Sequence, residues 1–168
     1  MGACASCCCM ECIMDSYLHV QIRNISKANF KGDINISGTS DVCVKIKWQS
    51  YQQDTDIHKG EKGSIFFNEP LILENAEPNT EEKLRIEVWD VDKATADDLL
   101  AYAEVPMPEN YGGNVAEQTV ELKDPSSGAG VGEICIDQVH FIKQKVRRYM
   151  GPCKCLCCCL NTGQDADN

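Results

Sequence analysis

The sequence predicts an all-β protein, an antiparallel β-sandwich of about eight strands. Three observations support this fold class. Short segments alternate apolar and polar residues, turns rich in Gly, Asn, Asp and Pro separate them at short intervals, and no segment between the ends has a helical period. The chain has 168 residues, which is enough for one domain with a full hydrophobic core.

Each expected strand follows such an alternation. In the first, Leu18, Val20 and Ile22 are separated by polar residues, so one face is expected to be buried. Turn residues stand between the strands, as in the sequence Pro-Ser-Ser-Gly at 125–128. The expected strands lie at 17–25, 42–48, 65–67, 71–73, 84–89, 100–107, 118–122 and 132–142.

The charge of the chain limits its partners. Acidic residues outnumber basic residues 26 to 16, and the formal net charge is -10. This argues against nucleic acid as a partner, and it disfavours an anionic membrane unless the charge is locally neutralised or lipid supplies the attachment. The sequence has neither a secretory signal nor an apolar run of transmembrane length, so we expect a reduced, cytosolic body.

An acidic loop is expected between the strands at 84–89 and 100–107. It contains Asp90, Asp92 and Asp98, and the apolar alternation leads directly into the first of them. Carboxylates so close together repel one another, and a hard cation such as Ca²⁺, which takes several oxygen ligands, would neutralise them. The alternative is a solvated acidic turn.

Five segments, in order over nearly the whole body at 16–145, carry a resemblance to a known family. They are the strand at 17–25, Gly-Thr-Ser-Asp-Val-Cys-Val at 38–44, Phe-Asn-Glu at 67–69, the strand and acidic loop at 84–100, and the strand at 132–136. These segments resemble, in the same order, the opening strand, the Gly-x-Ser-Asp-Pro-Tyr-Val segment, the Trp-Asn-Glu turn, the strand with the third calcium loop, and the closing strand of the C2 domain family. The resemblance implies one C2 domain between two tails, 1–15 and 146–168.

This resemblance implies a fold, a cofactor and a partner. The fold is an eight-stranded Greek-key sandwich of the second C2 topology, which binds Ca²⁺ through loops at one end and then engages anionic phospholipid. Asp41 matches the second aspartate of the family's first calcium loop. Either Asp33 or Asn35 completes the site, and Asn35 would supply a neutral oxygen that weakens calcium binding. The implied calcium ligands are Asp33, Asn35, Asp41, Asp90, Asp92 and Asp98.

Two isoleucines flank Asn35 in the first loop. If Ile34 and Ile36 lie at the tip of the loop, they are candidates for insertion into a bilayer interface. The alternative is that one of them packs inward as part of the core.

Cysteine is concentrated at both ends of the chain. The start Met-Gly-Ala-Cys-Ala-Ser fits N-myristoylation of Gly2, and neighbouring cysteines are candidates for palmitoylation, which would add the second signal that stable anchoring needs. Basic residues precede the C-terminal cysteines and would favour an anionic surface. The candidate acylation sites are Gly2, Cys4, Cys7, Cys8, Cys9, Cys153, Cys155, Cys157, Cys158 and Cys159, and the candidate basic contacts are Lys143, Lys145, Arg147 and Arg148.

The same cysteines have a second reading. The spacing of Cys4 and Cys7, of Cys9 and Cys12, and of Cys155 and Cys158 is that of Zn²⁺ ligands, although adjacent cysteines suit tetrahedral sites poorly. Two further cysteines, Cys43 and Cys135, lie inside expected strands and are interpreted as small buried apolar residues.

Two functions are compatible with these features. The leading one is a lipid-anchored peripheral membrane protein on the cytosolic face, whose C2 domain binds Ca²⁺ and phospholipid or a protein partner. Strand counting puts both tails opposite the acidic loops, so the protein could bridge two membranes. The alternative is a calcium-independent C2 adaptor in a larger assembly. No Ser-His-Asp or glycine-loop motif indicates an enzyme.

Overall fold

The computed structural model describes residues 10–26, 30, 40–61, 64–79, 81–91 and 96–149. The chain forms two compact units, one of Met1–Asp15 with Gln144–Asn168 and one of Ser16–Lys143. Every regular element in the described residues is a β-strand, and the pairings recorded between strands are antiparallel, so the expected all-β class is confirmed.

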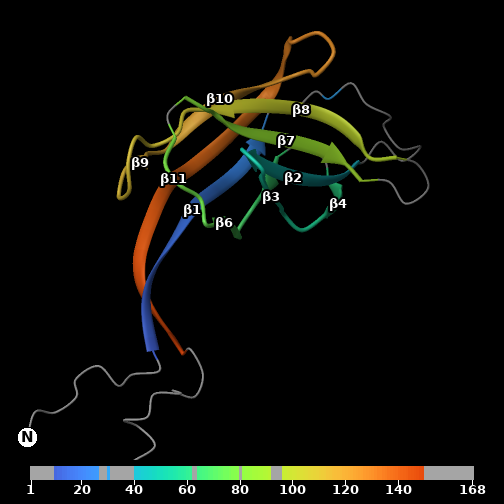
Figure 1. Cartoon of the computed structure of the whole chain (residues 1–168). Helices are drawn as coiled ribbons and strands as arrows, with labels where there is room; N and C mark the ends of the chain where they lie inside the picture. Colours follow the sequence, from blue (N-terminus) through green and yellow to red (C-terminus); the bar gives the residue numbers. More distant parts are fainter. Residues whose placement is uncertain are drawn as a thin grey trace, which may run out of the picture. The chain divides into compact units, whose positions relative to one another are not determined.

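The described residues form eleven strands (Figure 1). In chain order they are β1 (Met10–Ser26), β2 (Ser40–Trp48), β3 (Tyr51–Asp54), β4 (His58–Glu61), β5 (Ile65–Phe66), β6 (Pro70–Glu74), β7 (Leu84–Asp90), β8 (Asp98–Val105), β9 (Asn114–Val115), β10 (Gln118–Lys123) and β11 (Gly130–Tyr149).

The strand order divides naturally into two layers. Neighbouring strands follow the order β3-β2-β7-β8-β10-β11-β1-β5, while β4 pairs with β2, β6 with β1 and β9 with β11. A single residue pair, Lys123 with Tyr102, joins β10 to β8. The sheet built on β2, β7 and β8, which run side by side in Figure 1, therefore packs as one layer, and the sheet built on β10, β11 and β1 packs as the other.

All eight expected strands are present, as β1, β2, β5, β6, β7, β8, β10 and β11, whereas β3, β4 and β9 were not expected from the sequence. Both β3 and β4 pair with β2 as two parts of an interrupted strand, and both β5 and β6 pair with β1 in the same way. Thr55 causes the first interruption, because its hydroxyl oxygen accepts a hydrogen bond from the Val44 amide (3.0 Å) while its own amide donates to the Val44 carbonyl (2.8 Å). A side chain thus replaces one rung of the ladder, and the edge strand resumes at His58.

The core lies between the two layers and consists of the inward-facing residues of each alternation. Trp48 and Phe141 are among its largest fully buried side chains, and their rings meet edge to face with centroids 5.4 Å apart. Cys43 is buried as expected. The same expectation is wrong for Cys135, which is only half-buried because it lies between the inward-facing Ile134 and Ile136 and so points out of β11.

Truncating the core aromatic side chain should destabilise the domain strongly. We expect Phe141→Ala to lower the free energy of unfolding by about 3–5 kcal/mol, because it removes buried contacts and leaves a cavity beside Trp48. Urea denaturation measures the change. Phe66→Ala is the matched control, since Phe66 is 61% exposed, and its effect should stay below about 1 kcal/mol. Equal losses in the two variants would contradict the assignment of Phe141 to the core.

Candidate metal centre and the charged sheet face beside it

Strand register brings three of the predicted calcium ligands to one end of a sheet. Val42 of β2 pairs with Asp90 of β7, and Asp90 pairs with Asp98 of β8. Asp41 precedes Val42, so Asp41, Asp90 and Asp98 lie on three neighbouring strands at nearly the same level. The sequence predicted these residues as ligands from a resemblance, and the register explains how strands can present them together.

Asp90 is the most enclosed of the three. It is only 2% exposed, and its Oδ1 accepts a hydrogen bond from the backbone N–H of Asp41 at 3.1 Å. The carbonyl of Asp41 in turn accepts from the N–H of Val91 at 2.8 Å. These two bonds lock the end of β7 to the start of β2, and they orient a carboxylate that would be costly to bury without partners.

Asp98 lies opposite Asp90 but is exposed to solvent. Like charges directly opposite each other on neighbouring strands are destabilising, so this end of the sheet favours a nearby positive charge. Carboxylate oxygens from separate strands are also the donor set that Ca²⁺ prefers. The donor atoms of Asp41, Asp90 and Asp98 are therefore of the kind that the predicted ion takes, but in the described residues these three do not form a group whose ligand atoms all lie within 4.8 Å of one another.

Several predicted site residues fall outside the described residues, so their roles stay predictions. They are Asp33, Asn35 and Asp92 of the expected calcium site, Ile34 and Ile36 of the first loop, and the acylation candidates Gly2, Cys4, Cys7, Cys8, Cys9, Cys153, Cys155, Cys157, Cys158 and Cys159.

The basic residues of the last strand are described only in part. Arg147 and Arg148 belong to β11, but their side chains are not described. Lys143 and Lys145 are exposed, as expected for residues offered to an anionic surface, and Lys143 Nζ lies 4.6 Å from the centre of the Tyr111 ring. Their predicted contact with a membrane remains untested.

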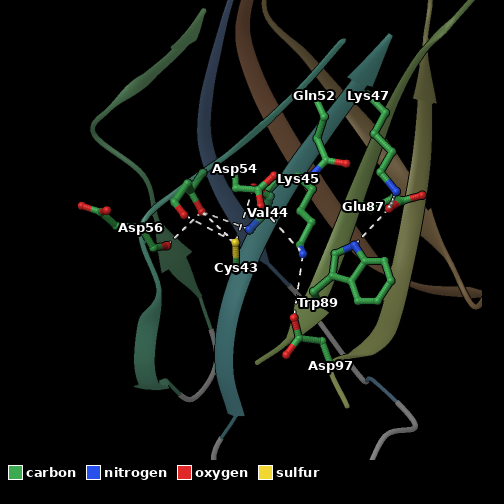
Figure 2. Close-up of polar contacts among 11 residues, drawn as sticks. Cys43, Val44, Lys45, Lys47, Gln52, Asp54, Asp56, Glu87, Trp89 and Asp97 are labelled. Carbon is green, nitrogen blue, oxygen red and sulfur yellow. Dashed lines mark hydrogen bonds and ion pairs between the residues drawn. The ribbon is translucent and has the colours of Figure 1, made fainter. Parts of the chain in front are cut away.

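Sequence reasoning missed a charged cluster on the outward face of β2 and β7, which we call the Trp89 cluster. Figure 2 shows its central members, Lys45, Lys47, Glu87, Trp89 and Asp97. Lys45 Nζ lies 3.7 Å from Asp54 and 3.8 Å from Asp97, and 4.8 Å from the centre of the Trp89 ring. One ammonium thus contacts β3, β7 and the segment preceding β8.

Glu87 is the buried anion of this cluster. It is 5% exposed and accepts from Lys47 Nζ at 2.7 Å, from Arg85 Nε at 2.8 Å and from the Trp89 indole N–H at 3.0 Å. Burial alone would raise the pKa of Glu87, but these three donors outweigh it and leave the pKa below its ordinary value. The sequence contained a signal for this cluster, because positions 45, 47, 85, 87 and 89, which alternate outward along two strands, hold Lys, Lys, Arg, Glu and Trp.

In the part of the chain that the structure describes, a compact group of possible metal ligands lies beside β11 instead. One donor atom each from Glu117, Cys135 and Asp137 lies within 4.8 Å of the others. The guanidinium of Arg23 contacts both carboxylates at 2.6 Å, so a cationic side chain already fills the place that a metal would take. We interpret this group as an ion-pair cluster rather than a metal site.

Comparison with known proteins identifies the family. The C2 domain model matches residues 16–122, which is more than half of the chain, and the chain therefore belongs to the C2 domain family. No curated protein sequence matches the chain. In the described residues, no helix is long and apolar enough to cross a membrane.

Solved structures are similar in fold at low sequence identity. A C2 domain of plant Extended Synaptotagmin 1 is 15% identical with a TM-score of 0.58, and the match covers 77% of this chain and 95% of that one. A structure of Extended-Synaptotagmin 2 that spans its SMP domain and two C2 domains is 15% identical with a TM-score of 0.55, and the match covers 82% of this chain and 29% of that one. Human GIVD cytosolic phospholipase A2 is 15% identical with a TM-score of 0.57. That match covers 82% of this chain and 17% of the other, so this chain corresponds to a small part of that enzyme.

The Trp89 cluster should make stability depend on pH. Because the folded pKa of Glu87 is lowered, its carboxylate stabilises the fold above the ordinary carboxyl pKa of about 4.3, and this contribution is lost as the pH falls through the folded value. We expect Glu87→Gln to lower the free energy of unfolding by about 1–2 kcal/mol at neutral pH, and by less in acid. Urea denaturation at about pH 7 and about pH 3 measures both differences.

The control for this prediction is Glu104→Gln. Glu104 is an exposed partner of Lys83 at 3.5 Å, and such surface pairs contribute little. A loss in Glu87→Gln that does not shrink in acid, or that Glu104→Gln matches, would contradict the proposed role of the buried carboxylate.

Proposed function

We propose that the protein is a lipid-anchored peripheral membrane protein on the cytosolic face, whose C2 domain binds Ca²⁺ and then phospholipid or a protein partner. The observation that carries this proposal is the buried Asp90 carboxylate, held by the Asp41 amide and paired across the sheet with Asp98. We propose a binding role rather than a catalytic one, because carboxylate oxygens from separate strands are ligands of the kind that Ca²⁺ prefers.

The ion would be held by residues of two loops. Asp41, Asp90, Asp92 and Asp98 supply carboxylate oxygens, and either Asp33 or Asn35 completes the set. Bound Ca²⁺ would supply positive charge at an acidic end of a chain whose formal net charge is -10, which favours the approach of an anionic phospholipid. Ile34 and Ile36 would then contact the membrane interface.

The tails would provide attachment that does not depend on calcium. Myristoylation at Gly2 together with palmitoylation of neighbouring cysteines gives the two signals that stable anchoring requires. Lys143 and Lys145, both exposed, would add attraction to an anionic surface, with Arg147 and Arg148 further along the same strand. The loops would then be left to bind a second membrane or a protein.

One observation favours the alternative, a calcium-independent C2 adaptor. Lys45 contacts Asp97, the neighbour of Asp98, so the acidic end has a positive charge of its own. A neutral oxygen from Asn35 in place of a carboxylate would weaken calcium binding further. In such a protein the sandwich would serve as a protein-binding module.

Calorimetric titration of the full chain with CaCl₂ separates these two functions. We expect heat of binding from the wild type and its loss, or a weakening of more than about tenfold, in Asp90→Asn, because this change removes charge from the most enclosed ligand. Glu104→Gln, which removes a charge at the opposite end of β8, should bind as the wild type does. Absence of binding in the wild type would favour the adaptor.

Anchoring and bridging are tested together with vesicles. Acylated protein from a eukaryotic host should cluster phosphatidylserine-containing vesicles when Ca²⁺ is added, because tails and loops engage different bilayers. Gly2→Ala, which removes the myristoylation site, should still bind these vesicles with Ca²⁺ but no longer cluster them. Dynamic light scattering measures clustering, and intact-protein mass spectrometry reports the acyl groups. Wild-type binding to single vesicles without clustering would contradict bridging.

A further inference from the structure

We infer that His19 and His140 form an acid-sensitive pair, which weakens the contact between β1 and β11 when the pH falls below neutrality. The two strands are neighbours in the sheet, and the two imidazole rings lie with their centres 5.9 Å apart and their planes tilted by 59°. The inference concerns the stability of the sandwich, so it depends neither on calcium nor on lipid.

Both histidines lie on the outward face of the sheet, directly over the core. His19 stands between the buried Leu18 and Val20, and His140 stands between two core residues of β11 in the same way. Both residues are half-buried, so neither ring is fully in water. Charge on these rings is therefore costlier than on a fully solvated histidine.

The surroundings of the ring nitrogens favour the neutral state of the pair. His19 Nδ1 is buried and has no hydrogen-bond partner in the part of the chain that the structure describes, so a proton on it would be a buried donor without an acceptor. His140 Nδ1 lies 2.7 Å from Gln138 Nε2, and it accepts from this amide nitrogen only while it carries no proton. Protonation of His140 at Nδ1 therefore requires the Gln138 amide to turn over.

The residues opposite the pair on the flanking strands are uncharged. Ile72 of β6 is opposite His19, and Asn114 of β9 is opposite His140. Glu74, the acidic residue of β6, lies two residues further along that strand. The flanking strands therefore do not place a carboxylate directly across from either ring.

The remaining titratable or charged side chains of β1 and β11 within Ser16–Lys143 lie further along the two strands. Arg23 and Asp137 form an ion pair at 2.6 Å, and Lys143 lies over the Tyr111 ring. The full set on these two strands is Tyr17, Arg23, Glu133, Cys135, Asp137 and Lys143.

Acid charges both rings and makes them repel each other. At a half-buried site and this separation, the repulsion disfavours double protonation by a factor on the order of ten. The pKa of His19 is lowered, first by burial and second by the charge of His140. Since this pKa lies below the ordinary value of 6.5, the folded state takes up fewer protons than the unfolded chain, and stability is lost as the pH falls below that value.

Thermal unfolding of the full chain in chelator, at about pH 7 and about pH 5.5, tests this inference in a window above the titration of ordinary carboxyl groups. The melting temperature of His19→Gln should fall by about 2–4 °C less than that of the wild type, because the pair no longer gains two charges. His140→Gln should also lose less than the wild type, and the double variant should match His19→Gln.

His58→Gln is the matched control. His58 is the third histidine of the chain, it belongs to β4, and its ring packs against Phe67 with centroids 4.7 Å apart. Since it lies apart from the pair, its replacement should leave the acid-induced loss equal to that of the wild type.

Two further measurements locate the effect and remain available if a variant at His19 fails to fold. The titration midpoint of the His19 ring, followed by NMR, should rise in His140→Gln because one repelling charge is gone. In acid, amide hydrogen exchange corrected for its intrinsic pH dependence should speed up more in β1 and β11 than in β2 and β7.

The outcomes decide between a pair and a single buried ring. Smaller losses in both single variants, with a raised His19 midpoint in His140→Gln, support the inference. A smaller loss in His19→Gln with an unchanged His19 midpoint in His140→Gln assigns the effect to burial of one ring and overturns the pair. Equal losses in the wild type and both single variants, or an equal change in His58→Gln, also overturn it.

Discussion

The pairing of Asp90 with Asp98 across β7 and β8 is the constraint on which the functional end of this domain depends. Hydrogen-bonded register fixes it, so the two residues stay opposite each other as long as the sheet is intact. A buried carboxylate such as that of Asp90 must be offset by positive charge or hydrogen-bond donors. The structure supplies the Asp41 amide as a donor. A divalent cation would add positive charge.

The charged side chains on the outward face of β2 and β7 gather around a single aromatic residue. Trp89 donates its indole N–H to the buried Glu87, while Lys45 and Lys47 lie over its ring at 4.8 and 5.6 Å. Glu87 also accepts from Lys47 and Arg85. Lys45 differs from Lys47, because its carboxylate partners are Asp54 of β3 and Asp97, which precedes β8.

The fold could be predicted because a period of two in the sequence maps directly onto a half-buried strand. The interruption of the edge strand at Thr55 could not be predicted, because it depends on a hydroxyl oxygen that accepts a hydrogen bond from the Val44 amide of a neighbouring strand. Asp90 and Asp98 were predicted as ligands, but their direct opposition depends on a register shift between Val88 and Trp89 that no local pattern encodes. The reach of Lys45 to Asp97 is likewise a property of packing rather than of spacing.

A calcium site of modest affinity would be compatible with the attachment by the tails that we propose. Anchoring would raise the effective concentration of the domain near lipid, so the loops would need less intrinsic affinity to engage a surface. A soluble C2 domain, by contrast, must obtain all of its membrane affinity from the ion and the loops. The proposed anchor would therefore reduce the affinity that the loops require, and a neutral oxygen from Asn35 in place of a carboxylate, which weakens calcium binding, would be tolerated at the proposed site.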